Sequence, residues 1–257
     1  MNWLSKLWQS LLTLGQVITQ LVVYRQLHWR NTKEQMAVVG TDSLLITLVT
    51  ASFVGAVFTI QVAKEFISFG ATQAIGGVLA LALSRELSPV LTAVIIAGRV
   101  GSAFAAELGT MTVTEQIDAL YMLRSSPITY LVTPRIVACV LMMPLLTMFA
   151  FLTGMAGGIL ICQNAYNIPQ ATFLDSVRTF LKSWDLITAL IKAGVFGALI
   201  GVIGTTWGLT TTGGAKGVGQ STTTAVVTSL LAIFASNFFL SWLFFGGVAS
   251  QVASSFN

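Results

Sequence analysis

The stretch LITALIKAGVFGALIGVIGTTWGLT, at residues 186–210, decides the fold class of this chain. A helix needs about 20 mainly apolar residues to cross the hydrocarbon core of a bilayer, and this run is longer. It contains one charged residue, Lys192. Four similar apolar runs accompany it, so the sequence predicts five transmembrane helices, at residues 43–63, 78–104, 136–162, 186–210 and 225–249.

The composition of the whole chain agrees with a membrane setting. Of the 257 residues, 55% are hydrophobic and 9% are charged, whereas about 25% of the residues of soluble domains are charged. The mean hydropathy is +0.84. We therefore expect a single all-α integral membrane domain over residues 1–257.

Several classes of function are disfavoured. The net charge of +4 comes from scattered basic residues, so no nucleic-acid partner is expected. With one histidine, neither a His-based metal cluster nor a Ser/His/Asp set is expected, and Cys139 and Cys162 lack the spacing of a metal site. The sequence GGAKG at 213–217 lacks the GK[ST] ending of a phosphate-binding loop. We expect no cofactor, no catalytic residue and no ATPase site in this chain, which is therefore not an enzyme on its own.

The first 30 residues predict an amphipathic helix that lies in the membrane interface. Apolar residues recur there at helical spacing, and polar residues fill the other side. The same spacing argues against a signal peptide. A helix that packs on the spans is the alternative. The apolar positions include Trp3, Leu4, Leu7, Trp8, Leu11 and Leu12.

Basic residues predict the orientation of the five spans. With the N-terminus inside, the external segments carry only Lys64, Arg178 and Lys182, and most other basic residues fall on internal segments. This distribution follows the positive-inside rule, so the N-terminus is placed in the cytoplasm and the C-terminus outside. No Arg- and Ser-rich transit peptide is visible, which favours a multi-pass protein of the bacterial inner (plasma) membrane, with the plastid inner envelope as the alternative.

Glycines at intervals of four mark faces for close helix packing, because small residues let helices approach each other. The sequence leaves open whether these faces meet within one chain or across a dimer. The fourth run contains Gly194, Gly197, Gly201, Gly204 and Gly208, which include two pairs at this interval, and the third run contains the pair Gly154 and Gly158.

Arg85, Glu86 and Lys192 fall well inside predicted spans. A charge near the centre of a span costs about 2.5–3.5 kcal/mol on insertion scales, so it usually faces a partner or a watery cavity. Pro89 cannot donate to the Arg85 carbonyl, so the helix should kink or open there. We expect a polar spot in an apolar cavity, suited to an amphiphile with an anionic head. A structural ion pair between spans two and four is the alternative, and Arg99 is interpreted as an ordinary anchor.

The loop at about residues 105–135 predicts a short helix of its own. Thr112 and Glu115 fit a capping box at its start, and Pro127 follows its end. Composition alone favours a helix that rests on the membrane surface.

The run RELSPVLTAVIIAGRVGSAFAAELGTMTVTEQIDAL, at residues 85–120, resembles the signature region of MlaE-type permeases. The resemblance covers nearly the whole chain, more weakly in the first 40 residues. It continues at SPITYLVTPRIVA (126–138), LIKAGVFG (190–197) and TTTAVVTSLLAIFASNFFL (222–240).

This resemblance implies the permease subunit of an ABC transporter that moves phospholipid or a related lipid between membranes. It implies a homodimer with an interfacial helix and five spans per subunit. Each subunit would dock on a separate cytoplasmic ATPase, and a lipid cavity between the subunits would open toward an MCE-domain substrate-binding protein. A secondary transporter and a non-transporting membrane scaffold are the alternatives.

The resemblance also implies roles for particular residues. Arg85, Glu86 and Lys192 match the charged cavity positions and are expected to bind the substrate. The helix at 107–123 matches the cytoplasmic coupling helix that contacts the ATPase. Its expected contact residues are Glu107, Thr114, Glu115, Gln116 and Asp118. The sequence GVGQSTTTAVV (217–227) departs from relatives that carry additional arginines there.

Overall fold

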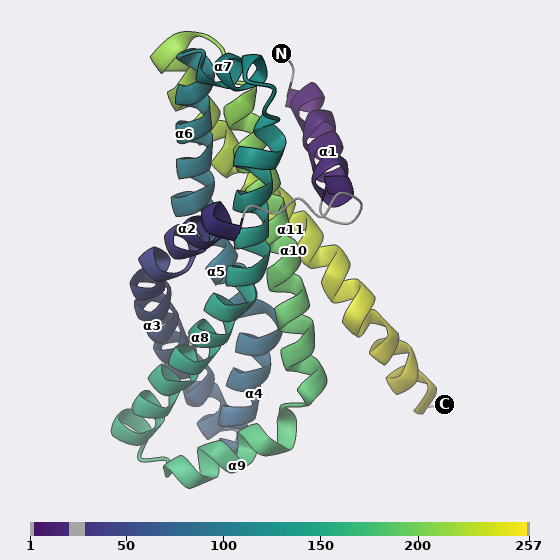
Figure 1. The fold of residues 1–257 in the computed structure, drawn as a ribbon. Coiled ribbons are helices and arrows are strands. Elements are labelled where there is room, and N and C mark those ends of the chain that lie inside the picture. Colours follow the sequence, from purple (N-terminus) through teal and green to yellow (C-terminus); the bar gives the residue numbers. More distant parts are fainter. Residues whose placement is uncertain (1–2, 21–28, 256–257) are drawn as a thin grey trace. The chain divides into compact units, whose positions relative to one another are not determined.

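The computed structural model describes residues 3–20 and 29–255, and every regular element in these residues is a helix (Figure 1). In chain order the elements are α1 (Trp3–Thr19), α2 (Trp29–Val39), α3 (Thr41–Ser68), η2 (Thr72–Ala74), α4 (Ile75–Ala82), η3 (Leu83–Leu87), α5 (Ser88–Ile96), η4 (Ala97–Gly101), α6 (Ser102–Val113), α7 (Gln116–Met122), η5 (Ile128–Val132), α8 (Thr133–Tyr166), α9 (Gln170–Phe180), α10 (Ser183–Leu209) and α11 (Gly214–Ser255).

Five stretches of helix in the described residues are long and apolar enough to cross a membrane, which confirms the predicted fold class of an all-α protein with five spans. Their limits differ from the predicted ones, most clearly at the starts of the first and fifth stretches. They are Trp29–Ser68, Thr72–Val113, Ile128–Tyr166, Ser183–Leu209 and Gly214–Gly246.

The fifth span begins at Gly214, whereas hydropathy placed its start near residue 225. The prediction was wrong because the first turns of this helix are polar, although they are regularly helical. Thr222, Thr223 and Thr224 lower the hydropathy of this segment. Their hydroxyl groups donate to backbone carbonyls four residues earlier, at 2.8, 3.1 and 2.8 Å. Such bonds let threonine lie inside a helix with its hydroxyl satisfied.

The second span is not a uniform α-helix. The π-helical segments η3 and η4 interrupt it, and a third π-helical segment, η5, precedes α8. At the end of η3 the N–H of Ser88 donates to the carbonyl of Leu83, five residues back. This opening lies directly before Pro89, as the sequence predicted, and π-helical turns often occur at functional sites.

The chain divides into two compact units, described separately below. Unit 1 comprises Met1–Ser43, Ala93–Met143 and Gly194–Ser236, and unit 2 comprises Leu44–Thr92, Pro144–Ala193 and Asn237–Asn257. The long helices α8, α10 and α11 each contribute to both units.

In unit 1 one face of α1 packs on other helices. Val17 is buried against Val132, Ile136 and Val202, and the indole N–H of Trp3 donates to the Thr228 hydroxyl at 3.1 Å. This face of α1 therefore packs on the spans, as the alternative to an interfacial helix expects. A second face of α1 exposes apolar residues, which the prediction of an interfacial helix requires. Residues 1–2 and 21–28 of the predicted interfacial segment lie outside the described residues. The exposed apolar residues of α1 are Trp3, Trp8, Leu11, Leu12 and Ile18.

The glycine faces pack within the chain. In unit 1, Gly197 and Gly201 of α10 lie against α8, at Cys139 and Ile136, and Gly204 and Gly208 lie against the second span. In unit 2, Gly154 and Gly158 of α8 lie against α3 and the second span. A side chain at most of these positions would collide with a neighbouring helix, so the glycines set how closely the spans approach.

The sequence did not predict α9. This helix packs in unit 2 on the first turns of α4 (Figure 1). The N–H of Gly77 donates to the buried Ser176 hydroxyl at 2.9 Å. A side chain on Gly76 would meet the carbonyl of Phe173. This backbone-level contact fixes α9 on the end of the second span.

The segment after the second span corrects two predictions. A single helix over 107–123 is wrong, because α6 ends at Val113 and α7 begins at Gln116, with Glu115 between them in a left-handed conformation (φ 60°). The capping box is also wrong, since Thr112 lies within α6 and its hydroxyl donates to the carbonyl of Leu108 at 2.8 Å.

The end of α7 is a Schellman motif. Arg124 adopts the left-handed conformation (φ 54°), its N–H donates to the carbonyl of Tyr121 at 3.0 Å, and the N–H of Ser125 donates to that of Leu120 at 3.0 Å. The chain therefore leaves this short helix sharply, shortly before Pro127.

Candidate functional site

Lys192 lies on α10 at the centre of a charged network in unit 2. Its side chain is fully buried (0% exposed). The ammonium group donates to the carbonyl of Arg85 at 2.8 Å, to Oε1 of Glu86 at 2.9 Å and to the hydroxyl of Ser241 at 2.7 Å. An ammonium has three N–H groups, so these three acceptors use all of its donors.

Glu86, on η3, is the acceptor of the same network. Its Oε1 accepts from Lys192 and from the Ser241 hydroxyl at 2.7 Å, and its Oε2 accepts from the side-chain amide of Asn237 at 2.7 Å. The Glu86 side chain keeps 44% of its surface exposed. Two spans and the unit 2 part of α11 thus hold one accessible carboxylate in a fixed position.

The contact between Lys192 and the Arg85 carbonyl follows from Pro89. In a regular helix that carbonyl would accept from the N–H four residues later, but Pro89 has no N–H. The ammonium of Lys192 replaces the missing donor from a neighbouring helix. The break in the second span and the buried cation are therefore two parts of one arrangement.

Arg85 has a counter-ion that the sequence did not indicate. Its Nε donates to Oδ1 of Asp185 at 2.8 Å. Asp185 lies in the first turn of α10, where a helix favours negative charge, and its Oδ2 accepts from the N–H of Lys182 at 3.0 Å. Asp185 is buried (2% exposed) while Arg85 is 37% exposed, and the guanidinium lies 4.5 Å from the centre of the Phe245 ring.

The accessible halves of both ion pairs line one groove. The groove has a volume of about 450 Å³, and apart from Ser241 its remaining wall is apolar. The pattern is the same in both pairs, since an accessible charge (Arg85 or Glu86) is fixed by a buried counter-charge (Asp185 or Lys192). The groove residues are Val78, Leu81, Ala82, Arg85, Glu86, Ser241 and Phe245.

The structure brings Arg85, Glu86 and Lys192 together, as their placement in the spans suggested. Lys192 and Glu86 form an ion pair between spans two and four, and Arg85 and Glu86 also line a groove. Sequence reasoning missed Asp185, Asn237 and Ser241. Asn237 and Ser241 lie four residues apart in an apolar run and so share a helix face, which was the available signal.

The residues expected at the ATPase lie elsewhere, in unit 1. Thr114, Glu115, Gln116 and Asp118 are exposed around the start of α7. The end of the same helix carries three exposed apolar side chains that the sequence analysis did not single out as a group. We call Tyr121, Met122 and Leu123 the α7 patch.

Glu107, the fifth residue expected there, is already paired. Its Oε2 accepts from Nη2 of Arg135 at 2.8 Å. Arg135 is buried (8% exposed), its guanidinium lies 5.5 Å from the centre of the Phe104 ring, and Glu107 is 52% exposed. This pair fastens α6 to α8.

Arg99 is more than an anchor that reaches toward the interface. Its Nη1 donates to the carbonyl of Val38 at 3.1 Å and to the Ser43 hydroxyl at 2.6 Å, and Asp42 is an ion-pair partner at 3.8 Å. Within unit 1, Arg99 therefore joins η4 to the junction of α2 and α3.

Comparison with known proteins agrees with this architecture. Residues 32–243 match the family model described as Permease MlaE. The chain is 62% identical to the "Probable ABC transporter permease protein slr1045" of Synechocystis, over 95% of this chain and 93% of that protein. It is 51% identical to "Protein TRIGALACTOSYLDIACYLGLYCEROL 1, chloroplastic" of Arabidopsis thaliana, over 93% and 68%, and 44% identical to the "Probable ABC transporter permease protein ycf63" of Pyropia yezoensis, over 100% and 97%.

Five apolar spans and these matches define a multi-pass membrane permease of the ABC transporter class. The chain belongs to the MlaE permease family, as its signature region indicated.

Proposed function

We propose that this permease moves phospholipid or a related lipid between membranes, driven by a separate ATPase. The observation that carries the proposal is the groove of unit 2, where two fixed and accessible charges adjoin an apolar wall. A membrane lipid has the matching chemistry, since it joins a charged head to apolar chains. The printed name of the Arabidopsis relative contains the word trigalactosyldiacylglycerol, which is a lipid, and this supports a lipid cargo.

In this proposal the four charges have two roles. The Arg85 guanidinium binds the lipid phosphate, because its fork of N–H groups suits phosphate oxygens. Glu86 faces the same groove and binds hydroxyl or amine groups of the head. Lys192 and Asp185 are buried and act as positioning residues, since each holds an accessible charge in place. Thus only two of the three expected substrate-binding residues contact lipid directly.

The ATPase is proposed to dock on the exposed surface of α7. Thr114, Glu115, Gln116 and Asp118 supply polar contacts, and the α7 patch supplies apolar ones. Glu107 contributes through its pair with Arg135. ATP binding can change the lipid groove only if the ATPase binds two permease states with different affinity, so lipid binding should persist without the ATPase and pumping should not.

The proposed assembly is a homodimer with an MCE-domain protein on the outer side and no nucleic-acid partner. The proposed location is the bacterial inner membrane, with the plastid inner envelope as the alternative. The Synechocystis and chloroplastic relatives are compatible with either setting.

The lipid role is tested by reconstituting the permease with its ATPase and measuring transfer of a fluorescent phospholipid between membranes. Arg85→Met should lower ATP-dependent transfer about tenfold or more, because a hydrogen-bonded charge contact with the phosphate is lost. Arg178→Met is the matched control, since Arg178 is an exposed arginine of the same unit. Transfer without the ATPase, or equal transfer by both variants, contradicts the proposal.

The docking surface is tested by co-purification of the ATPase. Tyr121→Asp should weaken its retention about tenfold, as expected for an aromatic residue at the centre of an interface. Phe69→Asp is the control, because Phe69 is also an exposed aromatic residue. It directly follows α3, at the end of the first span that the predicted topology places outside. Full retention of the ATPase by Tyr121→Asp would exclude this docking surface.

A further inference from the structure

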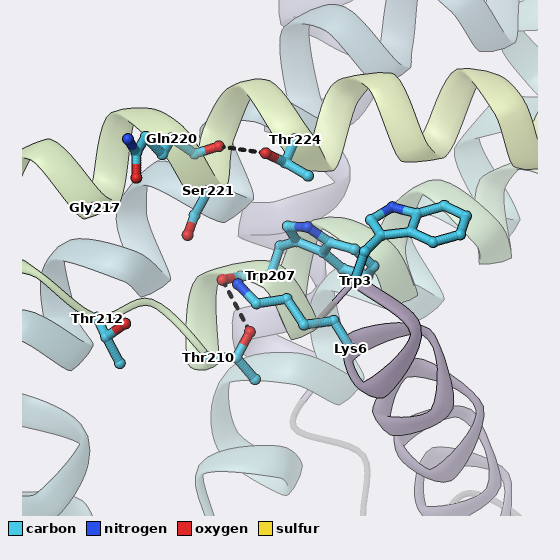
Figure 2. Close-up of a pocket in the computed structure, with 9 residues that line it drawn as sticks. All are labelled: Trp3, Lys6, Trp207, Thr210, Thr212, Gly217, Gln220, Ser221 and Thr224. Carbon is cyan, nitrogen blue, oxygen red and sulfur yellow. Dashed lines mark hydrogen bonds between the residues drawn. The ribbon is translucent and has the colours of Figure 1, made fainter. Parts of the chain in front are cut away.

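A second polar cavity lies within unit 1, between α1, the end of α10 and the start of α11 (Figure 2). Its volume is about 230 Å³. Lys6 extends into this region from α1, Ser221 points into it from α11, and Gln220 of α11 is among the lining residues. None of these residues takes part in the charged network of unit 2.

The cavity offers hydrogen-bond donors. The Lys6 ammonium lies 5.9 Å from the centre of the Trp207 ring, and among the described residues it has no hydrogen-bond acceptor and no ion-pair partner. Partial burial lowers the pKa of Lys6 below its ordinary value, since removal from water disfavours the charged form. A cation in this setting is stabilised by an anion that enters the cavity.

Trp207 and Ser221 supply further donors. Trp207 is fully buried, and its indole N–H has no acceptor within the part of the chain that the structure describes. A buried donor without a partner costs about 1–3 kcal/mol, so such groups usually mark a ligand or water. Ser221 is 6% exposed and its hydroxyl has no hydrogen-bond partner among the described residues. The nine described residues that line the cavity include one cation and no carboxylate.

The cavity lies at the turn between the fourth and fifth spans, since α10 ends at Leu209 and α11 begins at Gly214. The ends of membrane spans lie near the headgroup region of a bilayer. The helix that carries Lys6 also exposes Trp8, Leu11 and Leu12. Those side chains give α1 the apolar surface of an interfacial helix, so acyl chains can lie against it.

We propose that this cavity binds the phosphate group of a membrane phospholipid that resides beside α1 and is not the transported molecule. Lys6 and the indole N–H of Trp207 are the principal donors, and Ser221 and Gln220 complete the site. A free phosphate ester would satisfy the same donors. The apolar face of α1 favours the lipid as the source. The bound lipid fastens α1 to α10 and α11, and this role does not depend on the proposed function of the groove in unit 2.

The test is native mass spectrometry of the delipidated full chain, titrated with dioleoyl-phosphatidylglycerol. Dioleoylglycerol, which has the same chains without phosphate, is the matched lipid, and glycerol 3-phosphate is the soluble competitor. The variants are Lys6→Met, Lys6→Arg, Trp207→Phe and Ser221→Ala. Lys33→Met is the control, because Lys33 is an exposed lysine of the same unit.

We expect one phosphatidylglycerol per chain to bind about tenfold more weakly to Lys6→Met, since a charged hydrogen bond is lost. Trp207→Phe should weaken binding several-fold, Lys6→Arg should retain it, and Lys33→Met should not change it. The same Lys6-dependent binding should remain in Arg85→Met, which separates this site from the groove of unit 2.

Three results overturn the proposal. Equal binding of phosphatidylglycerol by wild type, Lys6→Met and Trp207→Phe excludes the site. Equal, Lys6-independent binding of dioleoylglycerol excludes recognition of phosphate. Displacement of the lipid by millimolar glycerol 3-phosphate shows that a soluble phosphate ester is the ligand instead. Ser221→Ala keeps the test informative if the Trp207 variant does not fold.

Discussion

The charged network of unit 2 and the Arg135–Glu107 pair of unit 1 both join neighbouring helices, but they differ in what is left accessible. In unit 2 a fully buried ammonium holds Glu86, and a buried carboxylate holds Arg85, so both signs of charge face one groove. In unit 1 the buried member is Arg135, and the carboxylate of Glu107 is half exposed.

In unit 2 the buried charges hold accessible charges in position, whereas the Arg135–Glu107 pair of unit 1 mainly joins two helices. Lys192 has all three donors satisfied, whereas Nε of Arg135 is buried without an acceptor among the described residues. Both carboxylates are partly exposed, 44% for Glu86 and 52% for Glu107, so either can be partly hydrated when its partner is removed. Loss of Lys192 is the costlier change because it also removes the donor of the Arg85 carbonyl and a hydrogen bond to Ser241. Three substitutions test this contrast, and a fourth tests the cavity beside α1.

The largest effect is expected from Lys192→Met. It removes three hydrogen bonds of a buried cation, and leaves Glu86 without its cation and the Arg85 carbonyl without a donor. The free energy of unfolding should therefore fall by about 3 kcal/mol and lipid transfer should be lost. The measurement is unfolding of the purified permease in detergent. Adding Glu86→Gln to this variant should recover part of the stability but not the transfer. If the double variant is as unstable as the single one, the pair is not the source of the loss.

Arg135→Met should cost less, about 1–2 kcal/mol, because Glu107 can be solvated once its partner is gone. Binding of lipid to the purified permease without the ATPase should remain close to that of wild type, because this pair does not line the groove of unit 2. The same unfolding measurement applies, together with lipid binding by the purified permease. A loss as large as that of Lys192→Met would remove the distinction between the two regions.

Ser241→Ala should lower the free energy of unfolding by about 1 kcal/mol, since one hydroxyl accepts from Lys192 and donates to Glu86. Ser236→Ala is the control on the same helix, because the Ser236 hydroxyl bonds only to its own helix, at Ala232 and Ile233. Equal effects of the two variants would argue against a special role of the network.

The smallest effect concerns pH. The pKa of Lys6 is lowered in the folded protein, so in the alkaline range below about pH 10.4 the unfolded chain binds more protons and stability rises with pH through this group. Lys6→Met should remove that slope while changing stability near pH 7 by about 0.5 kcal/mol or less. Lys33→Met should keep the slope. Unfolding curves between pH 7 and 10 measure it.

Hydropathy was sufficient to predict the number of spans, because each apolar run is at least as long as the roughly 20 residues that a spanning helix needs. It was not sufficient for their ends. Thr222–Thr224 made the start of α11 look like a loop, although their hydroxyls are satisfied by the helix itself. The position of α9 depends on a close approach to Gly76 and Gly77, and a contact between distant residues leaves no local pattern.

The charged residues inside the spans could be predicted from the sequence, but the residues that pair with them could not. Arg85, Glu86 and Lys192 stand out because charges are rare inside spans. Asp185 lies one residue before the predicted fourth span, so it did not stand out as a charge inside a span. The break between α6 and α7 was missed because a left-handed Glu115 has no sequence signal, and Thr112 mimicked a cap that the continuing helix makes unnecessary.

A further consequence follows from the hydrogen bond between Lys192 and the Arg85 carbonyl. Since Pro89 removes the internal donor, the opened backbone of the second span depends on a donor from a neighbouring helix. A rotation of α10 that withdraws the ammonium would leave the Arg85 carbonyl without a donor and Glu86 with only the side chains of Asn237 and Ser241 as described partners. The backbone opening at Pro89 and the carboxylate that faces the groove are therefore stabilised by the same ammonium group.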